Sequence, residues 1–193
     1  MMTRTLFFVA LLMLGSCATA PDRISNACAV FDQRDGWFNS WHREAKQVER
    51  EFGVPVPILM ATIYTESGFN PRARPARTKL LGFIPWKRPS TAYGYSQALD
   101  GTWTTYQAQT GRWGARRSNF SDAIHFIGWY HNRSHQLNGI ALNDPYGLYL
   151  AYYSGHAGYS KGSWRNSSTA QNGARRAADM ASRYATQLRG CGR

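Results

Sequence analysis

One carboxylate in the chain is placed where a general acid could work. Glu66 follows an apolar stretch, residues 57–64, that begins with Pro57 and predicts a buried helix. Gly68 can end this helix in a left-handed conformation, and Pro71 prevents its continuation. Partial burial and the negative end of the helix dipole both oppose ionisation, so we expect a raised pKa for Glu66, suited to proton donation. The alternative is a solvated glutamate at a frayed helix end.

Apolar residues at helical spacing predict that most of the chain is helical. Residues 38–52 carry apolar side chains with charges between them and end at Gly53, as in an amphipathic helix. Further helices are predicted over residues 96–106, 121–136, 146–153 and 170–188. No convincing strand pattern and no internal repeat appears, so the sequence predicts a single compact, mainly α domain of the all-α or α+β class.

A long basic loop separates Glu66 from the next predicted helix. Residues 72–92 contain six Lys and Arg around the apolar island Leu80-Leu81-Gly82-Phe83-Ile84-Pro85-Trp86. Loops of this length in compact domains are often functional. The loop can form a short hairpin whose exposed tip suits a bilayer interface or a glycan strand. The alternative is an island that folds back over the core.

The first residues are typical of an export signal. Arg4 is followed by nine apolar residues, 6–14, which are too few to span a bilayer, and then by small residues. The run Leu14-Gly15-Ser16-Cys17 resembles the bacterial lipobox, in which the cysteine becomes the acylated first residue of a lipoprotein. The alternative is an ordinary signal peptide that is cut after Ala18 or Ala20.

The lipobox resemblance implies three segments. Residues 1–16 would be the signal peptide, residues 17–36 a polar tether lipidated at Cys17, and residues 37–193 the folded domain. Ala18 lacks the aspartate that such lipoproteins often use for retention in the inner membrane. The resemblance therefore implies a chain that is anchored in the outer membrane and faces the periplasm.

Two cysteines remain near opposite ends of the exported chain. Because disulfides persist outside the cytoplasm, we expect Cys28 and Cys191 to pair. Closing so long a loop should stabilise the fold by roughly 4 kcal/mol through loss of entropy in the unfolded chain. The alternative is two unpaired thiols.

The charge balance predicts an anionic partner. Without residues 1–16 the chain keeps 22 Lys and Arg against 11 Asp and Glu, a net charge of +11. Export argues against nucleic acid as the partner, which leaves anionic phospholipid, lipopolysaccharide and the peptide carboxylates of peptidoglycan. The alternative is a basic surface that serves only solubility.

Three separated motifs together resemble the soluble lytic transglycosylase domain, which has a lysozyme-like fold. They are Glu66-Ser67-Gly68-Phe69-Asn70-Pro71, then Gly94-Tyr95-Ser96-Gln97, then Ala151-Tyr152-Tyr153-Ser154-Gly155. Their order agrees with that of the family, and the resemblance covers residues 37–190. It implies an α+β, lysozyme-like domain that cleaves peptidoglycan glycan strands.

The resemblance also implies roles for individual residues. Glu66 matches the single catalytic glutamate, and Ser67 matches the serine beside it that contacts substrate. Gly94 and Gln97 match the ends of the Gly-Leu-Met-Gln motif, and Tyr152 matches the tyrosine that lies beside the glutamate. Tyr95 and Ser96 replace Leu and Met, and Tyr153 and Ser154 replace Asn and Ala of the family pattern. These departures imply a more polar and aromatic surface toward the sugar.

Ordinary glycosidases use two carboxylates, and a second one is hard to find here. Downstream of Glu66 the chain has no other glutamate, and its aspartates read as helix caps or interior helix positions: Asp100, Asp122, Asp144 and Asp179. In the family one glutamate protonates the glycosidic oxygen and then takes a proton from the C6 hydroxyl of N-acetylmuramic acid. The resemblance implies that Glu66 plays both parts.

Aromatic and histidine side chains add further candidates. Tyr95 and Tyr153 are candidate stacking surfaces for sugar rings, whereas core packing is the better interpretation for Trp103 and Tyr93. The four histidines after Glu66 are His125, His131, His135 and His156. For His131 and His135 we expect exposed helix positions. His156 follows the third motif closely enough to reach the cleft.

The sequence therefore favours a periplasmic lytic transglycosylase that needs no metal and no cofactor, because no HExxH motif or second CxxC accompanies the histidines and cysteines. A hydrolytic muramidase is the second interpretation, and Asp100 or Asp122 facing Glu66 would favour it. A non-catalytic cell-wall-binding lipoprotein is the third. Expected partners are peptidoglycan strands, the outer membrane through the lipid anchor and possible cell-wall protein complexes, but no nucleic acid.

Overall fold

The structure is a computed structural model and describes residues 20–35 and 39–192. Its helices are α1 (Ala27–Phe31), α2 (Trp41–Phe52), α3 (Val56–Ser67), α4 (Asp100–Thr110), α5 (Phe120–Asn138), α6 (Pro145–Ser154), α7 (His156–Ser160) and α8 (Ser168–Gly190), with a 3₁₀ helix η1 (Ser163–Asn166) before α8. Two antiparallel strand pairs complete it: β1 (Arg34–Asp35) with β2 (Asn39–Ser40), and β3 (Lys79–Leu80) with β4 (Ile84–Pro85). The predicted mainly helical, lysozyme-like α+β class is confirmed.

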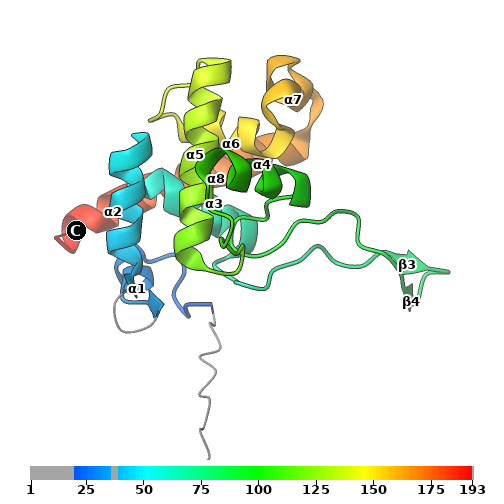
Figure 1. Ribbon diagram of the computed structural model, residues 1–193, viewed down its shortest axis with the longest axis horizontal. Helices are drawn as coiled ribbons and strands as arrows, with labels where there is room; N and C mark the ends of the chain where they lie inside the picture. Colours follow the sequence, from blue (N-terminus) through cyan, green and yellow to red (C-terminus); the bar gives the residue numbers. More distant parts are fainter. Residues whose placement is uncertain (1–19, 36–38, 193) are drawn as a thin grey trace, which may run out of the picture.

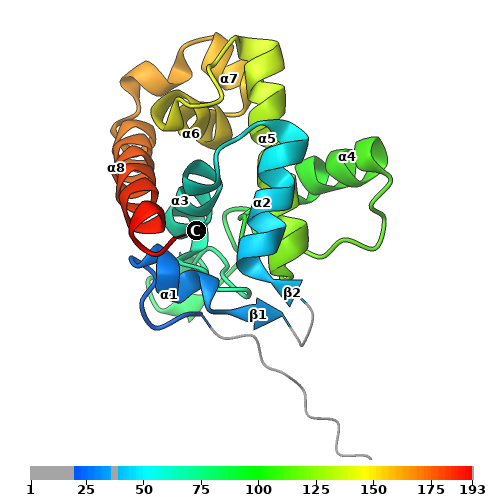
Figure 2. The same ribbon diagram turned by 90° about the vertical axis from the view of Figure 1, so that its left-hand side faces the viewer.

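Helix α3 lies in the middle of the molecule. It packs against α2, α5 and α8, and Figure 2 shows it with α8 on one side and α2 and α5 on the other. Seven of its residues, from Val56 to Ile63, are buried, as expected for a segment that is apolar nearly all round. It ends at Gly68, which takes a left-handed conformation with φ 56°. The element that carries Glu66 is therefore fixed on all sides by the core.

Helix α2 is the amphipathic helix that the sequence predicts. Trp41, Ala45 and Val48 are buried, and Gly53 ends the helix with φ 74°. The opposing α5 approaches closely, because a Cβ added at Gly128 would lie 2.4 Å from Cγ1 of Val48. Glycine at this position lets the two helices pack with little space between them.

The predicted tether is wrong for the part that the structure describes. Helix α1 packs against α8, and Ala27, Val30 and Phe31 are buried in the main core. Cys28 and Cys191 form a disulfide, which joins α1 to the end of α8. Beside it the Oε1 atom of Gln187 accepts a hydrogen bond of 2.8 Å from the backbone nitrogen of Ala27. The folded unit therefore begins before residue 27, and a chain that starts at Ala18 contains every contact described here.

One predicted helix begins later than expected. The sequence predicted it from residue 96, but α4 starts at Asp100, because Gln97 has φ 50° and Tyr93 pairs with Ala98 in an isolated β-bridge. A left-handed residue cannot continue a right-handed helix. The backbone over residues 94–98 is therefore a tight turn.

The basic loop projects as an arm. Figure 1 shows it reaching far from the helices and ending in the β3–β4 pair. The predicted short hairpin is thus present, and the alternative of an island folded over the core is wrong, since every residue from 76 to 87 is exposed. In the described part of the chain, no helix combines the length and the apolar character that crossing a bilayer requires.

Candidate active site

Glu66 lies in the last turn of α3, where α6 approaches it. The Tyr149 hydroxyl, on α6, donates a hydrogen bond of 2.7 Å to Oε1 of Glu66. Helix α6 is positioned by its own start, where the Asp144 carboxylate accepts hydrogen bonds from the backbone nitrogens of Tyr146 and Gly147. The capped helix α6 thus holds the Tyr149 hydroxyl against the Glu66 carboxylate.

Burial of the Glu66 carboxyl raises its pKa from 4.5 to about 7. The hydrogen bond from Tyr149 and the positive charge of Arg176 both lower the pKa, but they offset only part of the desolvation. The raised pKa that the sequence predicted is therefore confirmed, with burial as its largest cause. Near neutral pH the carboxyl can hold a proton, release it and take it back.

The tyrosine that touches Glu66 differs from the one the sequence pointed to. Tyr152 was expected beside the carboxyl, but its hydroxyl donates a hydrogen bond of 2.5 Å to the backbone oxygen of Ser96. Tyr149 lies one helical turn earlier on the same face of α6, with its ring 6.4 Å from that of Tyr152 and 27° from parallel. The i, i+3 spacing between Tyr149 and Tyr152, the tyrosine of the third motif, was the signal available in the sequence. Tyr152 therefore fastens α6 to the second motif.

Gly94 in the second motif has a backbone role. It has φ 75°, and a Cβ added there would lie 2.1 Å from the backbone oxygen of Arg117. The backbone nitrogen of Tyr95 donates to that same oxygen at 3.1 Å. Only glycine fits this approach, so Gly94 holds the turn against the loop before α5. A direct contact of Gly94 with substrate stays a prediction.

Tyr95 is not a stacking surface. Its side chain is fully buried, and its ring packs edge to face against Trp41 and Phe120, with centroids 5.7 and 5.9 Å away. The prediction that Tyr95 faces the sugar is wrong, because this tyrosine fills the core beneath the second motif.

The side-chain nitrogen of Gln97 is bound to the backbone. Its Nε2 donates to the backbone oxygens of Ala73 (3.0 Å) and Gly94 (2.8 Å). The carbonyl oxygen of the side chain is the part that can accept from a ligand. Ser67 Oγ donates to the backbone oxygen of Ile63 at 3.2 Å. Their predicted contacts with acetamido or hydroxyl groups stay predictions.

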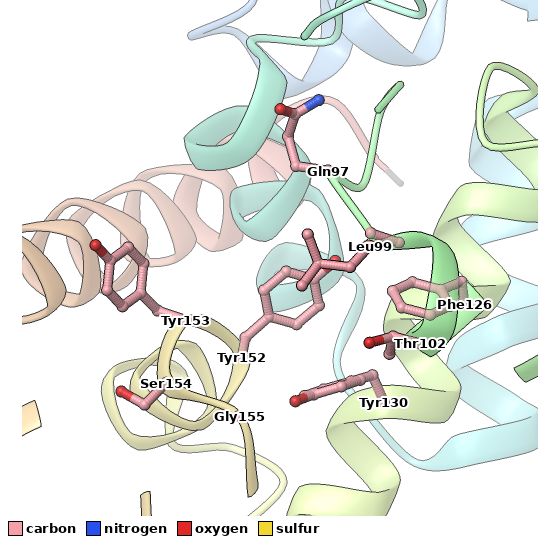
Figure 3. A pocket seen from close by; sticks show the side chains of 10 residues that line it. Gln97, Leu99, Thr102, Phe126, Tyr130, Tyr152, Tyr153, Ser154 and Gly155 are labelled. Carbon is pink, nitrogen blue, oxygen red and sulfur yellow. The ribbon is translucent and has the colours of Figure 1, made fainter. Parts of the chain in front are cut away.

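A hollow of about 230 Å³ joins the second and third motifs. Its walls come from α4, α5, α6 and the turn before α4: Gln97, Ala98, Leu99, Thr102, Phe126, Tyr130, Tyr152, Tyr153, Ser154 and Gly155. Figure 3 shows the rings of Tyr152 and Tyr130 projecting into it, while Tyr153 lies at its edge. Tyr153 is 50% exposed, and the stacking of its ring on a sugar stays a prediction. Burial, and after it the charge of Glu66, raises the pKa of Tyr152 in this wall.

A second hollow, of about 460 Å³, lies on the α8 side of Glu66. It is lined by Tyr64, Asn172, Arg175, Arg176, Asp179, Met180 and Arg183. Arg176 is the cation that lowers the pKa of Glu66, so the carboxyl is electrostatically coupled to this hollow as well as to the first. Glu66 itself lines neither hollow, but its charge interacts with Tyr152 in the wall of the first and with Arg176 in the wall of the second.

The two aspartates that would have favoured hydrolysis are held by arginines instead. Asp100 pairs with Arg117 at 2.7 Å, and Asp122 pairs with Arg112 at 3.1 Å. Neither aspartate contributes to the pKa shift of Glu66. Both carboxylates serve the loop between α4 and α5 rather than the site.

The histidines after Glu66 differ in burial. His131 is fully buried, its Nε2 lies 2.9 Å from Oγ1 of Thr62, and burial lowers its pKa to about 3. The predicted exposed position is therefore wrong for His131, whereas His135 is exposed. His156 stacks on Tyr130 at 4.3 Å, which puts it behind the wall of the first hollow. The described residues contain no cluster of three or more His, Cys, Asp or Glu that could hold a metal ion.

The two remaining aromatic candidates have different surroundings. Trp103 packs in the core, as expected. Tyr93 is half-buried and lies between two guanidinium groups, those of Arg74 at 4.3 Å and Arg117 at 5.5 Å from its ring centre. Core packing is therefore the wrong interpretation for Tyr93.

Comparison with known proteins places the chain in a family. A family model described as Transglycosylase SLT domain matches residues 5–191, nearly the whole chain. A search of curated proteins found no match. The family match agrees with the helical fold and with the buried glutamate at the end of α3. The chain belongs to the transglycosylase SLT domain family.

Proposed function

We propose that this protein is a peptidoglycan lytic transglycosylase that cleaves the β-1,4 bond between N-acetylmuramic acid and N-acetylglucosamine without water. Family membership supports the reaction class. The observation that carries the finer proposal is the Glu66 carboxyl, which accepts a hydrogen bond from Tyr149 and whose burial raises its pKa to about 7. Near neutral pH such a group can donate one proton and then accept another.

In the first step Glu66 donates its proton to the glycosidic oxygen as the bond from that oxygen to C1 of the muramic acid breaks. The leaving sugar departs with a free hydroxyl, and positive charge develops at C1 and the ring oxygen. The Glu66 carboxylate formed at this moment stabilises that charge. Tyr149 steadies the carboxylate by its hydrogen bond.

In the second step the C6 hydroxyl oxygen of the same muramic acid attacks C1 and its proton passes to Glu66. The new C1–O6 bond closes a 1,6-anhydro ring, and the enzyme regains its starting protonation state. No water is consumed, so one carboxylate serves as acid and then as base. General acid and base assistance of this kind typically contributes about 10²- to 10⁴-fold to the rate.

We further propose that the protein acts in the periplasm and is anchored to the outer membrane through an acylated Cys17. The sequence of the export signal and the lipobox supports this. Cys17 and the signal peptide lie outside the described residues.

The products of a sacculus digest test the reaction. Purified sacculi incubated with the chain from Ala18 onward should release muropeptides that end in 1,6-anhydroMurNAc, identified by mass spectrometry. Release of reducing MurNAc ends would favour a hydrolytic muramidase instead. No release by folded protein would favour a cell-wall-binding protein without catalysis.

Tyr149→Phe should shift the pH dependence of kcat/KM. The reaction needs a protonated Glu66, so the rate should fall as pH rises through about 7. Removing the hydrogen bond that lowers the pKa of Glu66 should move this falling limb to higher pH. We expect a shift of roughly one pH unit, since hydrogen bonds to charged groups are worth about 1.5–3 kcal/mol and one pKa unit is about 1.4 kcal/mol.

Tyr146→Phe is the matched control, because it removes a phenolic hydroxyl one turn earlier on the same face of α6, from a tyrosine that packs against the same cluster as Tyr149, whereas the hydrogen bond to Glu66 comes from Tyr149. It should leave the falling limb where it is. A Tyr149→Phe enzyme with an unchanged profile would contradict the assigned contact.

A further inference from the structure

The arm, residues 72–92, combines positive charge with an exposed apolar tip. It contains six Lys and Arg and neither Asp nor Glu. Within the described part of the chain, none of these six cations takes part in an ion pair. The arm therefore carries positive charge that no described carboxylate neutralises in an ion pair.

The tip, residues 80–86, exposes most of the large apolar side chains found on the described surface. Leu81 is 75% exposed, Phe83 72% and Trp86 51%, and Leu80 and Ile84 are exposed as well. Five of the nine large hydrophobic side chains that are exposed in the described residues thus lie within seven positions. A contiguous apolar group of this kind usually marks an interaction site.

The turn at the tip carries a residue that the turn itself disfavours. The backbone nitrogen of Phe83 donates to the backbone oxygen of Leu80, and the two central residues, Leu81 and Gly82, have φ 54° and 80°. Positive φ at both positions favours Asn, Asp or Gly, and a leucine there is strained. The leucine at the apex is therefore explained better by binding than by folding.

Hydrogen bonds hold the arm in one extended shape. The backbone nitrogen of Trp86 donates to the oxygen of Thr78 at 2.6 Å, and Nη1 of Arg77 donates to the oxygen of Trp86 at 3.0 Å. Near its base the Arg88 guanidinium donates to the backbone oxygen of Pro75. The tip is thus presented at a distance from the helices, as Figure 1 shows.

The chemistry of the tip distinguishes a bilayer from a glycan strand. A sugar face needs aromatic rings and hydrogen-bonding groups, and the aliphatic side chains of Leu80, Leu81 and Ile84 offer neither. A bilayer interface takes aliphatic side chains into its outer acyl region, takes Trp at headgroup level, and attracts nearby cations through anionic headgroups. Charge complementarity and the aliphatic tip together favour the bilayer.

We propose that the arm is a membrane-binding device that inserts its tip into the interface of a bilayer containing anionic phospholipid. This binding is independent of any acyl chain at Cys17 and of the glycan chemistry. The base of the arm is fixed to the second motif, since the backbone nitrogen of Gly94 donates to the oxygen of Ala73 at 3.0 Å. The arm therefore joins a membrane contact to one wall of the candidate site.

Vesicle cosedimentation tests the proposal with the chain from Ala18 onward, which lacks the lipidation site and keeps every described contact. The protein should pellet with vesicles that contain phosphatidylglycerol and stay in solution with vesicles of phosphatidylcholine alone. About 0.5 M salt should weaken the binding by shortening the Debye length. Trp fluorescence should shift to shorter wavelength when the anionic vesicles are added.

Two arm variants and one control locate the contact. Leu81→Asn with Phe83→Ser and Trp86→Ser should reduce vesicle binding at least tenfold, and so should Lys79→Ser with Lys87→Ser. Trp113→Ser removes an exposed apolar side chain outside the arm and should bind like the parent protein. Both arm variants should keep the parent melting temperature, because the side chains they change are exposed.

Three outcomes would overturn the proposal. In the first, the arm variants pellet with anionic vesicles as well as the control does. In the second, the parent protein does not bind anionic vesicles. In the third, the arm variants lose binding to purified sacculi but keep binding to vesicles. The last result would assign the arm to peptidoglycan. Sacculus digestion by the same variants is measured in parallel, so a failed membrane contact is distinguishable from a failed enzyme.

Discussion

Glu66→Gln should abolish the release of muropeptides from sacculi. Glutamine has the size of glutamate but cannot donate or accept the proton, so the loss should be at least about 10²- to 10⁴-fold. The fold should survive, because the change removes no charge that the core depends on and the amide oxygen can still accept from Tyr149. The measurement is the rate of release, with thermal unfolding as the check of folding.

Asp179→Asn is the matched control, since it makes the same carboxyl-to-amide change in the second hollow, beside Arg176. It should leave most of the activity. If Asp179→Asn were as inactive as Glu66→Gln, a second carboxylate would be at work and the reaction would be better described as hydrolysis. Substantial activity in Glu66→Gln would contradict the assignment of the acid.

Removal of the disulfide should have the largest effect on stability. The bond between Cys28 and Cys191 spans 163 residues of sequence and joins α1 to α8. The double variant Cys28→Ser, Cys191→Ser should lose about 4 kcal/mol of unfolding free energy, because its unfolded chain is less constrained. For a domain of this size the melting temperature should fall by about 8–16 °C.

Chemical denaturation of oxidised parent, reduced parent and the double variant measures this loss. Reduction should bring the parent down to the stability of the variant and leave the variant itself unchanged. Equal midpoints for all three proteins would show that the bond adds nothing to the fold. Sacculus digestion at 25 °C should change much less than stability, because neither cysteine borders the two hollows.

The helix that carries Glu66 was predictable because its pattern is unambiguous. A segment that is apolar nearly all round, with a proline at its start and glycine at its end, has few alternatives to a buried helix. Its burial then gave the direction of the pKa shift of Glu66 without coordinates. Both the helix and the direction of the pKa shift depend on neighbouring residues in the chain, so both could be predicted from the sequence.

Where a side chain points was much harder to predict. Tyr149 and Tyr152 lie on one face of α6, and small differences in helix position decide which hydroxyl reaches Glu66. Tyr95 looked like a sugar-facing departure from the family pattern, yet the left-handed turn at Gly94 directs it into the core. Such choices depend on tertiary packing rather than on spacing.

Short elements were also hidden from sequence reasoning. Helix α1 has five residues, too few to show a periodic pattern, and its tertiary contacts with α8 and the disulfide hold it in place. His131 is a polar residue type, so an exposed position was expected. Its buried ring has a hydrogen-bond partner in Thr62, which makes its burial in the core acceptable. In both cases the stabilising partner is distant in the sequence.

Glu66 alone should drive a cleavage that consumes no water. A sacculus digest in water enriched with ¹⁸O, followed by mass spectrometry of the fragments, tests it most directly. The parent protein should release 1,6-anhydroMurNAc ends that carry no ¹⁸O, and Glu66→Gln should release no such ends. Reducing ends that carry one ¹⁸O atom at C1 would contradict it, because they would show that water had attacked the sugar.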